Sequence, residues 1–152
     1  MAVDTLITQL QANRHMRSRA EVEAFDQALA QLANASDREV IEQLQEILMA
    51  FDDACEHIDV MWGLIHFAES YGMEAELQAL THVLPRLLPQ APEWVKTIHY
   101  RMLNDAASRT YYKTLLPSLP LPQQQTVRML LEEIAQEGGH LQEAAEFILS
   151  QE

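Results

Sequence analysis

Histidine and carboxylate side chains form two closely spaced pairs, and these residues are the best suited to bind a metal or transfer a proton. His66 lies three residues before Glu69, and His57 lies four residues after Asp53, so each pair would share one face of a helix. A carboxylate-bridged di-metal bundle needs Glu-x-x-His on each of two helices and a glutamate on each of two others. The sequence lacks this complete set. We therefore interpret the six histidines as hydrogen-bonded or solvated side chains.

Covalent catalysis has no better support in the sequence. No serine stands in a glycine elbow, and no glycine-rich loop could hold a phosphate group. The single cysteine, Cys55, has acidic neighbours that raise the pKa of a thiol and reduce its reactivity. We expect no catalytic residue, no metal and no cofactor, and we predict that the chain is not an enzyme.

Charge is the most unusual property of this chain, whose formal net charge is −13. Residues 39–80 hold ten acidic residues and no lysine or arginine, and residues 132–152 hold six acidic residues and no basic one. Such a surface repels phosphate backbones and anionic lipids, and it attracts basic proteins. We therefore expect a protein partner and no binding to nucleic acid or membrane.

Several acidic residues lie around a predicted helix junction, which makes them candidates for contact with a basic partner. Trp94 joins them because tryptophan is common at interface hot spots and this one opens a helix after a proline. A solvated acidic face and a buried tryptophan are the competing interpretations. The candidate contact residues are Asp52, Asp53, Glu56, Asp59, Glu74, Glu76 and Trp94.

Apolar residues recur every three or four positions along most of the chain, which predicts helices throughout. Capping boxes at Ser18 and Ser36 each predict a helix start. The segment 58–71 is apolar on nearly every side, so we place it at the centre, with Trp62 and Ile65 buried. Eight or nine helices result, with breaks expected near Gly72, Pro89, Pro117 to Pro122 and Gly138-Gly139.

These helices predict one all-α domain over residues 1–152. Antiparallel helix pairs could stack in a HEAT-like superhelix or form a compact bundle, and the roughly 40-residue length of successive pairs favours the stack. No segment is long and apolar enough for a membrane span, and no export signal opens the chain. A single cysteine fits a reducing compartment, so we expect a soluble cytoplasmic protein.

Three segments resemble the all-α immunity protein 30 family: Asp59–His66, Leu84–Trp94 and Arg101–Asn104. The likeness covers about residues 40–135 and consists of helix-packing residues. It implies a cytoplasmic immunity protein that neutralises a cognate toxin by one-to-one binding. The toxins of such polymorphic and contact-dependent growth inhibition systems are often nucleases encoded next to the immunity gene. The resemblance identifies neither the toxin nor the contact residues.

Three classes of function therefore remain. An antitoxin-type binding protein agrees best with the charge distribution, and its acidic surface would cover the basic cleft of a nuclease. An acidic helical-repeat scaffold or a secretion chaperone is the alternative, and a metal-dependent enzyme is the least favoured.

Overall fold

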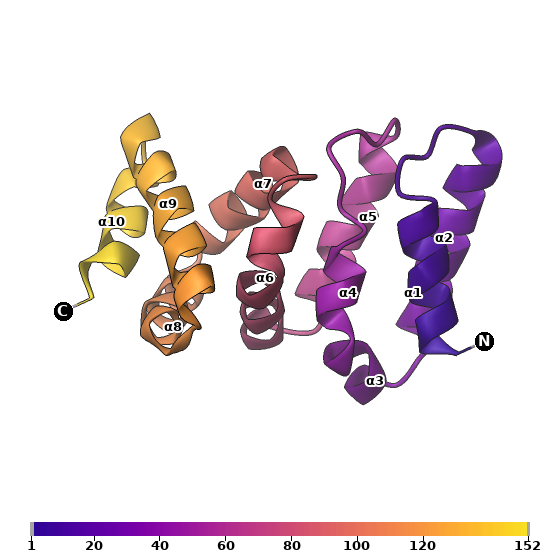
Figure 1. Cartoon of the computed structure of the whole chain (residues 1–152), viewed down its shortest axis with the longest axis horizontal. Coiled ribbons are helices and arrows are strands. Elements are labelled where there is room, and N and C mark those ends of the chain that lie inside the picture. Colours follow the sequence, from indigo (N-terminus) through magenta and orange to yellow (C-terminus); the bar gives the residue numbers. More distant parts are fainter. Residues whose placement is uncertain (1, 152) are drawn as a thin grey trace. The chain divides into compact units, whose positions relative to one another are not determined.

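The structure, a computed structural model, describes residues 2–151, and within this range it contains ten α-helices, one short 3-10 helix and no strand. The helices are α1 (Val3–Ala12), α2 (Arg19–Ala33), α3 (Asp37–Glu42), α4 (Leu44–Leu48), α5 (Ile58–Glu69), α6 (Met73–Leu87), α7 (Pro92–Leu103), α8 (Ala106–Leu115), η1 (Leu116–Ser118), α9 (Leu121–Glu137) and α10 (Gln142–Ser150). Figure 1 shows them in chain order. The all-α prediction is confirmed.

The helix starts expected from the capping boxes are present. The hydroxyl oxygen of Ser18 accepts a hydrogen bond from the backbone amide of Glu21 at 3.2 Å, and Ser36 accepts one from Glu39 at 3.3 Å. Each hydroxyl therefore satisfies an amide that has no partner within its own helix.

One predicted helix is divided in two. The segment after Ser36 forms α3 and α4 because Gln43, at φ −108° and ψ 10°, leaves the helical conformation between them. This break accounts for the tenth helix. Phe51 lies in the loop that follows α4, where its side chain is fully buried.

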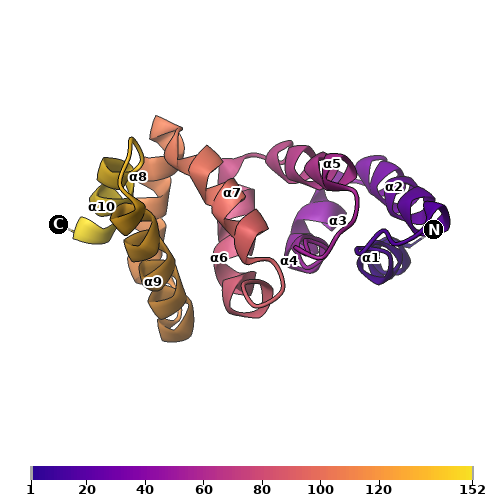
Figure 2. The same ribbon diagram turned by 90° about the horizontal axis from the view of Figure 1, so that it is seen from above.

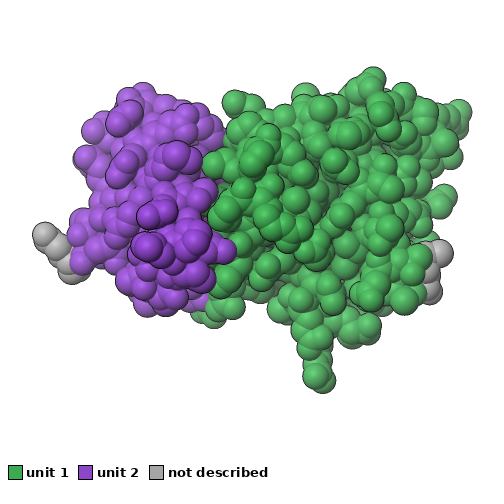
Figure 3. All heavy atoms as spheres, viewed as in Figure 1, with its two compact units in different colours: residues 1–94 green, residues 95–152 purple. Residues whose placement is uncertain are grey.

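The chain divides into two compact units, residues 1–94 and residues 95–152, coloured separately in Figure 3. The boundary falls within α7. A single domain over residues 1–152 stays a prediction, and so does the HEAT-like stacking.

The first unit holds two layers of helices around its core. α4 packs against both α1 and α6, and α5 packs against α2, with α1 also against α2 (Figure 2). Fully buried side chains from both layers fill the space between them: Leu10, Phe25, Leu32, Leu44, Ile47, Leu48, Phe51, Leu64, Ile65 and Leu84. One side of α5 faces this core and the other does not.

The second unit is built around α9 and α10, which pack against each other, and α8, which packs against α10. Gly138, at φ +74°, ends α9 in a conformation that glycine adopts without strain. In the described residues, no helix is long and apolar enough to cross a membrane.

Candidate functional site

Four of the seven candidate contact residues lie in or beside the loop between α4 and α5, residues 49–57, here called the acidic loop. Its backbone is held from two directions. The side-chain amide of Gln90 donates to the carbonyls of Met49 and Phe51 at 2.8 and 2.9 Å. The backbone amide of Glu56 donates to the carbonyl of His15 at 2.9 Å. The acidic loop therefore presents its side chains from a fixed backbone.

Asp52 points into the protein. Its carboxylate accepts hydrogen bonds from Arg14 Nε at 2.9 Å and from the Ala54 amide at 2.8 Å, and it lies 3.0 Å from His15 Nε2. Burial opposes ionisation, but the Ala54 hydrogen bond, Arg14 and His15 outweigh it, so the pKa of Asp52 lies below its ordinary value. With its side chain only 7% exposed, Asp52 anchors the loop.

Asp53 caps a helix that starts almost forty residues later. One carboxylate oxygen accepts from the Glu93 amide at 2.8 Å and the other from the Trp94 amide at 3.2 Å. These amides lie in the first turn of α7, where a helix has no internal partners for them and where its dipole favours a negative charge. The exposed residue Asp53 thus holds the start of α7 against the acidic loop.

Trp94 is 7% exposed, and its ring packs on two others. The Phe51 ring lies 5.9 Å from it, and the Trp62 ring meets it edge-on at 5.8 Å. Trp62 is only half-buried, so the prediction of a buried Trp62 was wrong, while Ile65 is fully buried as predicted. Trp94 is therefore the more buried of the two tryptophans, and Trp62 lies nearer the molecular surface.

Glu56 and Asp59 are exposed, and neither forms an ion pair within the described part of the chain. Together with Asp53 they form an acidic group at the amino end of α5. The other two candidates, Glu74 and Glu76, follow the opposite end of α5. A helix of twelve residues is about 18 Å long, so these two lie far from the amino end. There Glu74 is exposed and Glu76 is 5% exposed. The structure therefore separates the candidates into two groups.

The two units differ in charge. The first unit holds sixteen acidic residues and five lysines or arginines, whereas the second holds seven and five. Part of the acidity of the first unit is neutralised locally, because Arg38 pairs with Glu42 at 3.1 Å and Arg86 with Glu46 at 2.9 Å. Among residues 2–151, no lysine or arginine pairs with the acidic group at the amino end of α5, so its charge is available to attract a basic partner.

Ile58 is a surface residue that the sequence did not single out, because the whole segment 58–71 is apolar on nearly every side. It is 61% exposed. Asp59 and His66 on the same helix are also exposed. The placement of α5 against α2, α4 and α6 decides which of its apolar residues remain exposed.

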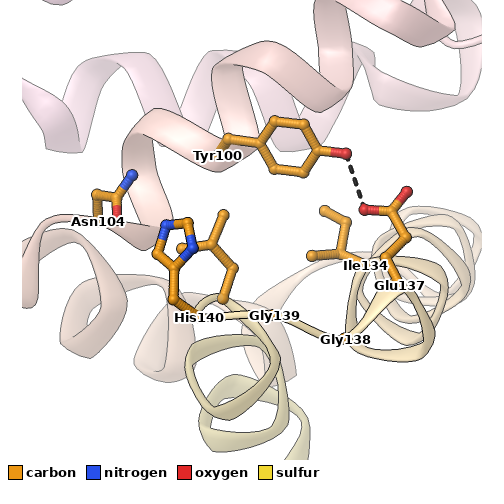
Figure 4. Close-up of a pocket in the computed structure, with 8 residues that line it drawn as sticks. Tyr100, Asn104, Ile134, Glu137, Gly138, Gly139 and His140 are labelled. Carbon is orange, nitrogen blue, oxygen red and sulfur yellow. Dashed lines mark hydrogen bonds between the residues drawn. The ribbon is translucent and has the colours of Figure 1, made fainter.

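A pocket of about 280 Å³ lies in the second unit (Figure 4). Glu137 and His140 line this pocket, and their Glu-x-x-His spacing is one that our sequence-based interpretation of the histidines did not include. The two glycines between them end α9, so the pair does not share a helix face. Glu137 accepts a hydrogen bond from Tyr100 at 2.8 Å and pairs with Lys96 at 2.8 Å, which lowers its pKa.

The described residues give little support for catalysis or for metal binding. Among residues 2–151, no three His, Cys, Asp or Glu side chains are grouped so that they could hold a metal ion. The thiol of Cys55 has a raised pKa, mainly because it is partly buried. His99 is fully buried and hydrogen-bonded through both ring nitrogens. The features that remain are a rigid acidic loop and the exposed side of α5.

An all-α chain whose acidic charge gathers around a helix junction has the features of a binding protein. The family model described as Immunity protein 30 matches residues 12–112, and the chain belongs to this family. This match begins and ends earlier in the chain than the resemblance noted in the sequence, which covers about residues 40–135. No curated protein and no solved structure matches the chain. Family membership implies an immunity protein that binds a cognate toxin protein.

Proposed function

We propose that this chain neutralises a nuclease toxin of a contact-dependent growth inhibition or related polymorphic-toxin system. It does so in the cytoplasm, as a one-to-one complex. The toxin surface that binds nucleic acid carries basic residues, and the immunity protein covers it with an acidic surface that takes the place of the phosphates. This blocks the substrate without any catalysis by the immunity protein.

The observation that carries this proposal is the acidic group formed by Asp53, Glu56 and Asp59, whose loop backbone is held and which pairs with no lysine or arginine among residues 2–151. A loop whose backbone is already ordered loses less conformational entropy on binding than a mobile loop, so the held acidic loop favours tight association. Asp52 contributes by anchoring the loop, and Trp94 by packing beneath the start of α7. Glu74 and Glu76 lie at the other end of α5, so we place them outside the main contact.

Charge reversal tests the proposal. The double variant Glu56→Lys, Asp59→Lys should weaken binding to the toxin domain encoded beside this gene by at least a hundredfold and abolish protection of cells that express it. Both residues are exposed and form no ion pair within the described residues, so the fold should survive.

The matched control is Glu132→Lys, Glu143→Lys in the second unit. It changes the net charge equally, at two exposed positions, and Glu143, like Asp59, lies in the first turn of a helix. The control should bind normally. If the control loses protection and the first variant keeps it, the toxin contacts the second unit and the site assignment fails. If the wild-type protein does not bind the toxin domain, the proposed function itself fails.

A further inference from the structure

Five residues form the side of α5 that turns away from the core, here called the outer face of α5: Ile58, Asp59, Trp62, Gly63 and His66. Their spacing of three and four residues places them along one side of the helix. Ile58 is 61% exposed, Asp59 and His66 are exposed, and Trp62 and Gly63 are partly exposed. The outer face therefore presents an aliphatic and an indole side chain to the surroundings of the protein.

Aromatic contacts join this face to the acidic loop. The Trp62 ring lies 6.1 Å from the His66 ring on one side and 5.8 Å from Trp94 on the other. The Trp94 amide in turn donates to Asp53. A single exposed isoleucine is common on protein surfaces and means little. Ile58, however, lies one helical turn from Trp62, whose ring packs on those of His66 and Trp94. The exposed carboxylates of Glu56 and Asp59 lie beside Ile58 in the sequence.

Gly63 lies in the middle of α5, where glycine costs about 1 kcal/mol of helix stability relative to alanine. A Cβ atom at this position would meet only the Leu29 Cδ2 atom, at 3.7 Å, which is an ordinary contact. Packing inside the chain therefore does not require a glycine. Gly63 is partly exposed, and without a side chain it allows a closer approach to the α5 backbone than any other residue would.

Apolar and charged groups are distributed on this surface as they are in protein interfaces, with an apolar centre and a polar rim. Ile58, Trp62 and Gly63 make the centre. Glu56 and Asp59 make the rim at the amino end, and neither has an ion pair in residues 2–151. The complementary partner surface has lysine or arginine residues around a projecting apolar side chain.

We propose that the outer face of α5 anchors the toxin, an inference that rests on the proposed function. An apolar or aromatic side chain of the basic toxin surface lies between Ile58 and Trp62, and the toxin backbone crosses α5 at Gly63. Lysine or arginine residues beside that side chain pair with Glu56 and Asp59. The charges then govern the rate of encounter, and the apolar anchor governs the lifetime of the complex.

Two substitutions test the anchor with little risk to the fold. Ile58→Ala should raise the Kd for the purified toxin domain encoded beside this gene at least tenfold, as expected for a central apolar contact. Gly63→Gln should also raise the Kd at least tenfold while leaving the Tm of the free protein unchanged or higher, because glutamine is the better helix former. A loss of binding without a loss of stability is not expected of a purely structural position.

Matched controls lie in the second unit. Leu121 is 65% exposed, so Leu121→Ala removes a similar exposed aliphatic group. Ala107 is exposed on α8, so Ala107→Gln adds the same side chain to another helix surface. Both controls should bind within twofold of the wild-type protein.

The outcomes separate the two proposals. If the wild-type protein binds the toxin domain and the Glu56→Lys, Asp59→Lys variant does not, the proposed function holds. If Ile58→Ala and Gly63→Gln then bind within twofold of wild type, the anchor is overturned while the acidic contact stands. Equal losses in the Leu121→Ala and Ala107→Gln controls also overturn the anchor. Absence of binding by the wild-type protein overturns both proposals.

Discussion

The carboxylate of Asp53 accepts a hydrogen bond from the backbone amide of Trp94 at 3.2 Å, across forty-one residues of sequence. The same carboxylate accepts from the Glu93 amide at 2.8 Å. One exposed acidic residue therefore fixes the acidic loop to the start of α7 and places the Trp94 ring against Phe51 and Trp62. The surface we assign to the toxin is held in place by the fold before any partner arrives.

Removing this cap should destabilise the free protein. Asp53→Ala leaves two first-turn amides of α7 without their acceptor, and the expected loss in free energy of unfolding is about 1 kcal/mol, as for other helix caps. Urea unfolding followed by circular dichroism measures it. Glu56→Ala, a neighbouring exposed residue without an ion pair, should change stability by less than about 0.5 kcal/mol. Equal effects of both variants would contradict the capping role.

The two tryptophans should differ in their contribution to stability. Trp94→Ala removes a ring that is 7% exposed and should cost about 3 to 5 kcal/mol, whereas Trp62→Ala removes a half-buried ring and should cost clearly less. Unfolding free energies of the two variants provide the comparison. A larger loss for Trp62 would place the centre of the packing on α5, as the sequence alone indicates.

This difference shows what periodicity can and cannot predict. Ile65 was correctly expected inside, because a helix that is apolar on nearly every side must be covered by its neighbours. A helix that is apolar on all sides contains no information about which side its neighbours cover. The packing of α2, α4 and α6 against α5 leaves Ile58 exposed and Trp62 half-buried.

The acidic residues show the same limit. Their number and clustering were visible in the sequence, and Ser18 and Ser36 were correctly identified as helix caps because a capping box is local. Asp52 is buried by Arg14 and His15, which lie almost forty residues earlier, and Asp53 caps a helix almost forty residues later. Charge counts do not distinguish such anchoring carboxylates from exposed ones like Glu56.

A buried histidine in the second unit should make stability depend on pH. The Val95 carbonyl can only accept, so His99 Nδ1 donates to it at 2.8 Å, and His99 Nε2 accepts from the Tyr112 hydroxyl at 2.8 Å. Burial lowers the pKa of His99 to about 4. The neutral ring is thus favoured by the fold, whereas the unfolded chain binds a proton near pH 6.5.

The free energy of unfolding should therefore be fully retained above pH 6.5 and fall as the pH decreases toward 4, by about 3 kcal/mol from this group. Denaturant titrations at several pH values measure the slope. His99→Gln, which keeps a donor and an acceptor but does not titrate, should flatten the slope between pH 6.5 and 4. An unchanged slope in this variant would assign the pH dependence to other groups.

Association with the toxin should depend strongly on salt. The field of the first unit reaches about 10 Å at 0.1 M salt and only about 3 Å at 1 M, so raising the salt removes the attraction that guides a basic partner. The association rate constant, measured by stopped-flow fluorescence of Trp62 and Trp94, should fall at least tenfold between 0.05 and 0.5 M sodium chloride. The dissociation rate should change much less, because the anchor at Ile58 is apolar.

The two charge-reversal variants show which acidic residues produce this attraction. Glu56→Lys, Asp59→Lys should lower the association rate at low salt and weaken its salt dependence markedly. Glu132→Lys, Glu143→Lys should slow association only slightly and leave the salt dependence almost unchanged, although its net charge is the same. If both variants lose the salt dependence equally, net charge alone guides the toxin, and the acidic group at the amino end of α5 has no special part in its approach.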